Sequence, residues 1–146
     1  MTSAKTLALE WRVAISFAAG VFATLLFHQP LFWVLGRLGL ADRPVYAMEP
    51  VPPFGVPSVL SLAFWGGVWG IVMIAALSRI RSDTKYWIMA VAFGAILPTL
   101  VAGAVVAPLK GQKLDGGAQL LLVGLLVNGA WGLGTALLFR LFARQK

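Results

Sequence analysis

Four polar side chains interrupt otherwise apolar stretches of this sequence and are the ones that could do chemistry: Thr24, His28, Thr99 and Asn128. His28 is the only histidine, and its imidazole could relay protons, bind a ligand or bond to nearby backbone. Asn128 and the two threonines could line a water path or bond across a helix interface. A single imidazole in a chain without cysteine is a poor ligand set, so we expect no metal and no cofactor.

The sequence lacks the arrangements that are typical of enzymes. It has no glycine–lysine loop for phosphate, no His-Glu pair at metalloprotease spacing and no nucleophile–histidine–acid set. None of its five acidic residues lies inside an apolar run, which disfavours a transporter or protease that relies on carboxylates within the membrane. We therefore predict a non-enzymatic protein.

The elements that position these residues are four charge-free runs, at 13–36, 50–78, 86–109 and 116–139. Each exceeds the ~20 residues that a helix needs to cross a bilayer, and the chain is 60% hydrophobic and only 12% charged. Within lipid, a run of this composition can satisfy the hydrogen bonds of its own backbone N–H and C=O groups only by forming a helix. We predict an all-α integral membrane protein in which two helical hairpins form one domain over 1–146. The helices are expected near 12–36, 57–78, 86–108 and 117–140, with a proline-rich outer loop at 37–57.

Basic residues predict the orientation of these helices. With the N-terminus inside, eight would face the cytoplasm: Lys5, Arg12, Arg79, Arg81, Lys85, Arg140, Arg144 and Lys146. Only four would lie outside: Arg37, Arg43, Lys110 and Lys113. This excess places both termini in the cytoplasm and favours a multi-pass protein of the bacterial inner membrane. The net charge of +7 then reflects topology and contact with anionic membrane lipids, and we expect no nucleic-acid partner.

Small residues recur at helical spacing on the second and fourth predicted helices. The positions that we expect to pack against neighbouring helices are Gly66, Gly67, Gly70, Gly124, Gly129 and Gly132. Flat faces of this kind allow backbones to approach closely, which is how helices associate in lipid. We expect Trp65 and Trp69 to fill grooves beside such glycines.

The chain contains a possible internal repeat. Gly-Val-Trp-Gly at 67–70 returns as Gly-Ala-Trp-Gly at 129–132, and the spacing of Trp11 and Phe17 equals that of Trp87 and Phe93. The two halves would then be related by a pseudo-twofold axis along the membrane normal, in contrast to inverted repeats. The alternatives are a duplicated hairpin and a chance recurrence in a glycine-rich chain.

Prolines mark three places where the backbone departs from a regular helix. Pro30 removes a donor near the Leu26 carbonyl, and Pro98 does the same for Gly94, so both helices are expected to bend. The outer loop holds five of the eight prolines and should be extended and stiff. It could be a spacer, a cap over the helix ends, a docking site or a gate.

Two kinds of function fit these features. In the first, the chain is a helix-packing subunit that assembles with itself or with a larger membrane protein through its glycine faces. In the second, it is a small oligomeric channel or carrier whose path runs near Thr24, His28, Thr99 and Asn128. We favour the first because stripes of small residues predict tight, dry contacts.

Overall fold

The structure is a computed structural model that describes residues 4–109, 111 and 117–143, with side chains from residue 8 onward. The chain is 80% helical, and four of its helical segments are long and apolar enough to cross a membrane. They are Ala8–Arg37, Ser58–Leu77, Asp83–Leu109 and Gly117–Ala143. The prediction of an all-helical chain with four apolar spans is therefore confirmed.

The first and third spans each contain a widened turn. The first consists of α1 (Ala4–Ala23), the π-helical turn η1 (Thr24–His28) and α2 (Gln29–Arg37). The third consists of α4 (Asp83–Val101), η2 (Ala102–Val106) and α5 (Ala107–Leu109). The second and fourth spans are the single helices α3 (Ser58–Leu77) and α6 (Gly117–Ala143).

Each widened turn lies just before a proline. The Gln29 amide donates to the Thr24 carbonyl in η1, and the Ala107 amide donates to the Ala102 carbonyl in η2. This shift of the hydrogen-bond ladder by one residue moves the carbonyl that Pro30 leaves without a donor from Leu26, as predicted, to Leu25. The helix continues through Pro30 instead of ending there.

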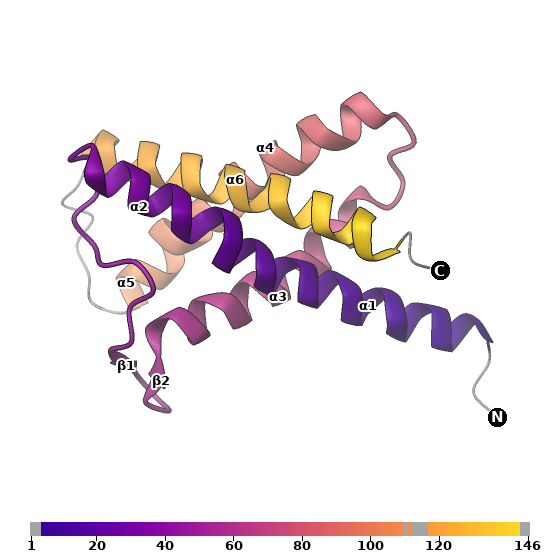
Figure 1. Ribbon diagram of the computed structural model, residues 1–146, viewed down its shortest axis with the longest axis horizontal. Helices are drawn as coiled ribbons and strands as arrows, with labels where there is room; N and C mark the ends of the chain where they lie inside the picture. Colours follow the sequence, from indigo (N-terminus) through magenta and orange to yellow (C-terminus); the bar gives the residue numbers. More distant parts are fainter. Residues whose placement is uncertain (1–3, 110, 112–116, 144–146) are drawn as a thin grey trace.

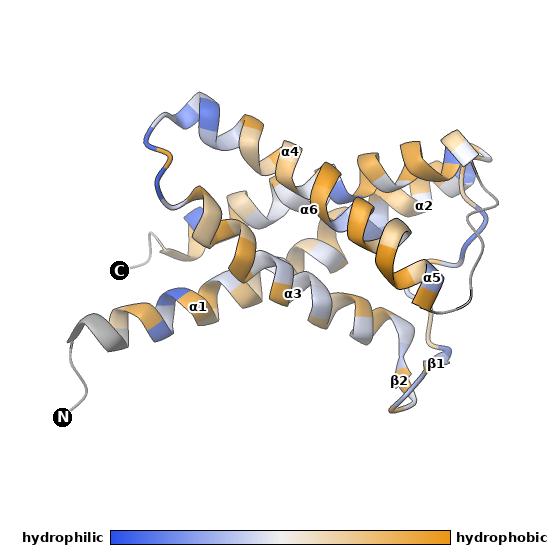
Figure 2. Cartoon of the chain, turned by 180° about the vertical axis from the view of Figure 1, so that it is seen from behind, coloured by the Kyte–Doolittle hydropathy of each residue, from blue (hydrophilic) through white to orange (hydrophobic). Residues whose placement is uncertain are grey.

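The helices form two pairs, α1 with α3 and α4 with α6, and the pairs join mainly through α1 and α6. Although α3 and α4 are consecutive, they meet over a much smaller surface. Both described chain ends and the α3–α4 turn lie at one end of the bundle, where α1 extends past the other helices (Figure 1). Orange apolar residues run along the helices, and blue gathers at the turn between α3 and α4 and in the loop after α2 (Figure 2).

The bundle has two apolar cores. The larger one lies toward the end with the termini and contains Ala23, Met73, Ile74, Leu77, Tyr86, Ala90, Trp131 and Ala136. The smaller one, at the opposite end, joins Leu35 of α2 to Val123 and Val127 of α6. Side chains from both hairpins fill each core, so the hairpins pack as one body.

The loop predicted to be extended and stiff contains a short antiparallel β-hairpin. Strand β1 (Pro50–Val51) pairs with β2 (Val56–Pro57). The Gly55 amide donates to the Val51 carbonyl at 3.0 Å, and Gly55 has a positive φ of 67°, which glycine adopts without strain. Four residues used above to predict orientation, Lys110, Lys113, Arg144 and Lys146, lie outside the described residues, as does the side chain of Lys5.

Candidate functional site

The closest helix–helix approach in the first hairpin lies where α1 crosses α3 at Gly20. A Cβ atom on Gly70 would lie 2.6 Å from the Ser16 carbonyl oxygen and 3.0 Å from Gly20 Cα. A Cβ on Gly20 would in turn clash with the Gly66 carbonyl oxygen. Only glycine allows the two backbones to come this close.

The second hairpin repeats this crossing between α4 and α6. A Cβ on Gly132 would clash with the Ala90 carbonyl oxygen and lie 3.0 Å from Gly94 Cα. A Cβ on Gly94 would clash with the Asn128 carbonyl oxygen. The contact therefore has the same pattern as in the first hairpin.

Equivalent contacts define which residues correspond between the hairpins. Gly70 corresponds to Gly132, as the sequence comparison predicts, and Gly20 corresponds to Gly94. Alignment of Trp11 with Trp87 would instead have paired Gly20 with Ile96. The structural register on the first and third spans therefore differs from the one inferred from tryptophan spacing.

The other predicted packing glycines also face helices of their own hairpin. A Cβ on Gly67 would meet the Phe17 ring at 2.5 Å, and one on Gly124 would meet Thr99 Cγ2 at 3.0 Å. Gly129 is less crowded, because its nearest neighbour, Ala95 Cβ, would lie at 3.5 Å. Faces already packed inside the chain are not free to bind a second chain, so assembly would require a different surface.

Thr24 and Trp131 meet at the Gly20 carbonyl. Thr24 Oγ1 donates to this oxygen at 3.0 Å, and the Trp131 Nε1–H of α6 donates to it at 3.1 Å. Both side chains are buried, with 2% and 3% of their surface exposed. The first crossing is thereby bonded to the second hairpin.

The tryptophans expected to fill the glycine grooves do not do so equally. Trp65 is 57% exposed and lies on the outer surface of the bundle, contrary to the prediction. Trp69 is half-buried and packs edge-on against Phe93, with ring centroids 6.1 Å apart. The buried indole is that of Trp131, which sequence spacing alone did not distinguish from Trp69.

Thr99 and Asn128 form a direct polar contact between α4 and α6. Asn128 Nδ2 donates to Thr99 Oγ1 at 2.9 Å, next to Gly124. Thr99 is buried, with 9% of its surface exposed, and Asn128 is half-buried. This is the cross-helix bond that an asparagine deep in an apolar helix makes.

His28 lies at the other end of the first span, beside Gln29. Its Nδ1 is 3.4 Å from Gln29 Nε2, and its ring stacks on Phe32 with centroids 6.2 Å apart. Gln29 Oε1 accepts from the Tyr46 amide at 2.7 Å. Among the side chains that the structure describes, no three His, Cys, Asp or Glu residues lie close enough to bind a metal ion.

Tyr46, in the loop after α2, completes this end of the bundle. Its hydroxyl donates to the Leu25 carbonyl at 2.7 Å, the oxygen that Pro30 leaves without a helical donor. A kink that exposes a carbonyl is usually satisfied by a neighbouring side chain or by water. Here the outer loop supplies that donor.

The four candidate pathway residues therefore divide into separate local contacts. Thr24 bonds to Gly20 within α1, and Thr99 bonds to Asn128 between α4 and α6. Within the described part of the chain, neither pair is bonded to His28. Each of these contacts is local to one span or to one pair of helices.

Arg140 organises the end of the bundle that holds the chain ends. Its guanidinium bonds to the Asp83 carboxylate at 2.7 Å and lies 4.0 Å from the centroid of the Tyr86 ring and 5.0 Å from that of Trp87. The pair is partly exposed, so its contribution to stability is modest. The spacing of residues in the sequence does not reveal that Arg140 of α6 is the partner of Tyr86 and Trp87.

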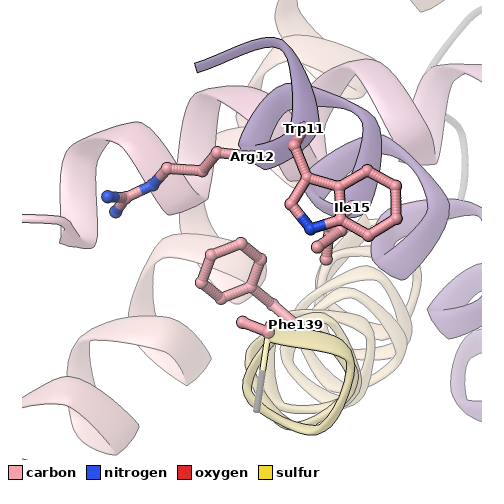
Figure 3. Close-up of a pocket in the computed structure, with 5 residues that line it drawn as sticks. Trp11, Arg12, Ile15 and Phe139 are labelled. Atoms are coloured by element: carbon pink, nitrogen blue, oxygen red, sulfur yellow. The ribbon is translucent and has the colours of Figure 1, made fainter. Parts of the chain in front are cut away.

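Two open hollows flank the projecting part of α1. One, of about 300 Å³, lies toward α6 and is lined by Trp11, Arg12, Ile15, Phe139 and Ala143. In Figure 3 the rings of Trp11 and Phe139 come from different helices, and the guanidinium of Arg12 points away from Trp11. The other hollow, of about 620 Å³, lies toward α3 and is lined by Leu9, Glu10, Val13, Ala14, Phe17 and Ile71.

Comparison with known proteins adds no relative to this description. No protein-family model, no curated protein and no solved structure matches the chain. The geometry of the chain itself therefore carries any statement about its function.

Proposed function

We propose that the chain is a non-enzymatic helix-packing subunit of a membrane assembly, either a homo-oligomer or a complex with a larger membrane protein. The observation that carries the proposal is the use of its internal polar groups. Trp131 bonds across helices to the Gly20 carbonyl, Asn128 bonds across helices to Thr99, and Thr24 bonds to a carbonyl of its own span. Because these interior groups already take part in contacts within the chain, the outer surface is the part available to bind another molecule.

The proposal includes a location and an orientation. The turn between α3 and α4, the start of α4, the end of α6 and the start of α1 lie at the end of the bundle that holds both described chain ends (Figure 1). These segments contain five basic residues: Arg12, Arg79, Arg81, Lys85 and Arg140. Arg37 and Arg43 belong to the opposite end. The positive-inside rule then favours cytoplasmic termini and insertion in a bacterial inner membrane.

The surface that best suits a partner is the projecting first part of α1. Leu9 is 62% exposed and Val13 is 40% exposed, and the two hollows lie on either side of this helix. A ridge between two hollows can interdigitate with side chains of another transmembrane helix. We propose a helix of a neighbouring subunit as the occupant.

A small oligomeric channel or carrier with a path near His28, Thr99 and Asn128 is the alternative. It requires these residues to face a shared path, whereas Thr99 and Asn128 bond to each other and His28 stacks on Phe32. Conduction would then require the α4–α6 contact to open. The packing proposal requires no such rearrangement.

Native mass spectrometry of the chain, extracted from its own membrane into lipid discs, tests the proposal. We expect a defined oligomer or a reproducible larger partner, and a monomer without companions would overturn it. Ala14→Trp fills the hollow toward α3 and should weaken the assembly, because Ala14 lines that hollow. Ala104→Trp is the matched control, since Ala104 is also exposed but lies in η2, toward the far end of the third span.

A functional readout separates the two classes. Solute flux into liposomes that depends on His28 and Asn128, with the assembly intact, would favour the channel or carrier. Unchanged flux in His28→Ala and Asn128→Ala, together with loss of assembly in Ala14→Trp, is the result expected of a packing subunit.

A further inference from the structure

The β-hairpin between α2 and α3 projects sideways from the bundle. It lies beside the first turn of α3 and extends no further along the long axis than the ends of α2 and α6 (Figures 1 and 2). A loop that served only as an aqueous cap would lie over the helix ends. A lateral position at the level of the helix ends coincides with the boundary between lipid and water.

The tip of this hairpin is apolar and exposed. Phe54 has 87% of its surface exposed, and it stands among Pro52, Pro53 and Gly55, with no charged residue in the tip. Exposed aromatic surface of this kind marks a contact with a partner or a membrane. An aromatic side chain is also the residue type enriched at membrane interfaces.

The apolar surface continues from the hairpin onto α3. Val56 is 38% exposed, Leu60 is 53% exposed and Phe64 is 52% exposed. Leu60 and Phe64 are one turn apart on the same face of the helix, which a bilayer would cover if α3 spans it. The exposed tip is therefore adjacent to surface already suited to lipid.

The hairpin is also fixed in place. The Ser58 amide donates to the Glu49 carbonyl, and the Val59 amide donates to the Ala47 carbonyl, each at 2.9 Å. Tyr46 ties the same segment to the first span through Gln29 and Leu25. A preorganised hairpin loses little conformational freedom when its tip enters a membrane interface.

We propose that the hairpin at 50–57 is a membrane-interface anchor, with Phe54 inserted among the lipid headgroups and upper acyl chains at this end of the bundle. The partner is the lipid surface itself. The inference rests on the proposal that α3 spans a bilayer. It adds that the hairpin fixes the depth at which α3 enters.

Site-directed spin labelling tests this inference directly, because the chain has no cysteine. Phe54→Cys is labelled with a nitroxide in the full chain in phospholipid vesicles, and collisions with oxygen and with a water-soluble nickel complex are compared. Asp42→Cys is the aqueous control from the same loop, and Phe64→Cys is the lipid control from α3. We expect oxygen to dominate at 54 and 64, and nickel to dominate at 42.

The outcomes separate the inference from the proposal beneath it. Nickel dominance at 54 with oxygen dominance at 64 would overturn the anchor and leave the spanning helix in place. Nickel dominance at 64 would overturn membrane spanning by α3 itself. Few collisions with either oxygen or the nickel complex at position 54 would indicate that the label is covered by protein. That result would also overturn the lipid anchor.

Discussion

The two glycine crossings have the same backbone geometry but different polar surroundings. At the first crossing, the Gly20 carbonyl accepts bonds from Thr24 and from Trp131 of the other hairpin. At the second, Pro98 deprives the Gly94 carbonyl of its helical donor, and Asn128 bonds to Thr99 within the same hairpin. The first crossing is therefore linked to the whole bundle, while the second is self-contained.

Together with α6, α1 forms the centre of the bundle. It packs against α3 through glycines and against α6 through the Trp131 bond, so it belongs to both interfaces. In lipid, where apolar surface gives little drive for association, close backbone contact and such bonds hold helices together. Both hairpins pack through a glycine crossing, but the carbonyl that accepts the hydrogen bond of Trp131 belongs to the first crossing.

The largest expected effect comes from removing the close approach itself. Gly20→Leu and Gly94→Leu should each lower the free energy of unfolding by about 3 kcal/mol, because a side chain there cannot avoid backbone of the facing helix. Unfolding by sodium dodecyl sulfate in mixed micelles, followed by circular dichroism, measures the loss. Equal losses would support equivalent crossings.

Gly129→Ala is the control for this prediction. Its new methyl group would meet Ala95 Cβ at 3.5 Å and Val91 Cγ1 at 3.6 Å, which are ordinary contacts. We expect the free energy of unfolding to change by no more than about 0.5 kcal/mol. A loss as large as that of the leucine variants would show that steric conflict with the facing backbone does not explain the sensitivity of Gly20 and Gly94.

The next largest effect concerns the bond between the hairpins. Trp131→Phe removes a buried hydrogen-bond donor and should lower the free energy of unfolding by about 2 kcal/mol. Trp69→Phe should lower the free energy of unfolding by less than about 1 kcal/mol, since Trp69 is half-buried and packs edge-on against Phe93. The same denaturation assay compares the two variants. Equal losses of unfolding free energy would contradict the proposed difference between the two glycine crossings.

The lengths of the charge-free apolar runs predicted the spans well, because apolar runs long enough to cross a bilayer admit only helices. For example, α3 spans Ser58–Leu77 where 57–78 was expected, whereas α1 begins at Ala4, ahead of the expected start at residue 12. The β-hairpin at 50–57 was not foreseen, since a proline-rich segment offers no alternating pattern from which to infer strands.

Sequence reasoning recovered some of the polar contacts but not their partners. Small residues at four-residue spacing identified Gly70 and Gly132 as packing positions, and depth in the span identified Asn128. The partner of Trp131 could not be predicted, because it is a backbone carbonyl and every residue of the chain has one. Tyr46 was likewise missed, since its bond to Leu25 depends on the widened turn before Pro30.

A smaller effect is expected for the polar contact within the second hairpin. Asn128→Ala and Thr99→Val, made singly and together, should show a coupling energy of about 0.6 kcal/mol, the usual value for a bond between membrane helices. Additive losses would show that the 2.9 Å contact contributes nothing beyond packing.

The smallest effect is expected at the kink before Pro30. Tyr46→Phe removes the hydroxyl that satisfies the Leu25 carbonyl but keeps the ring and the amide bond to Gln29. Because Tyr46 is 44% exposed, water can replace the lost donor, and global stability should fall by no more than about 0.5 kcal/mol.

Amide hydrogen exchange provides the sensitive measurement for that variant. The segment around Tyr46 should exchange faster in Tyr46→Phe, while amides of α3 beyond Val59 stay unchanged, because only the tie to the first span is weakened. Unchanged exchange at Tyr46 would show that Gln29 alone holds the loop. The kink of the first span would then need no protein donor. It would resemble the end of the third span, where Pro108 follows η2 and no bond from a described side chain reaches Gly103.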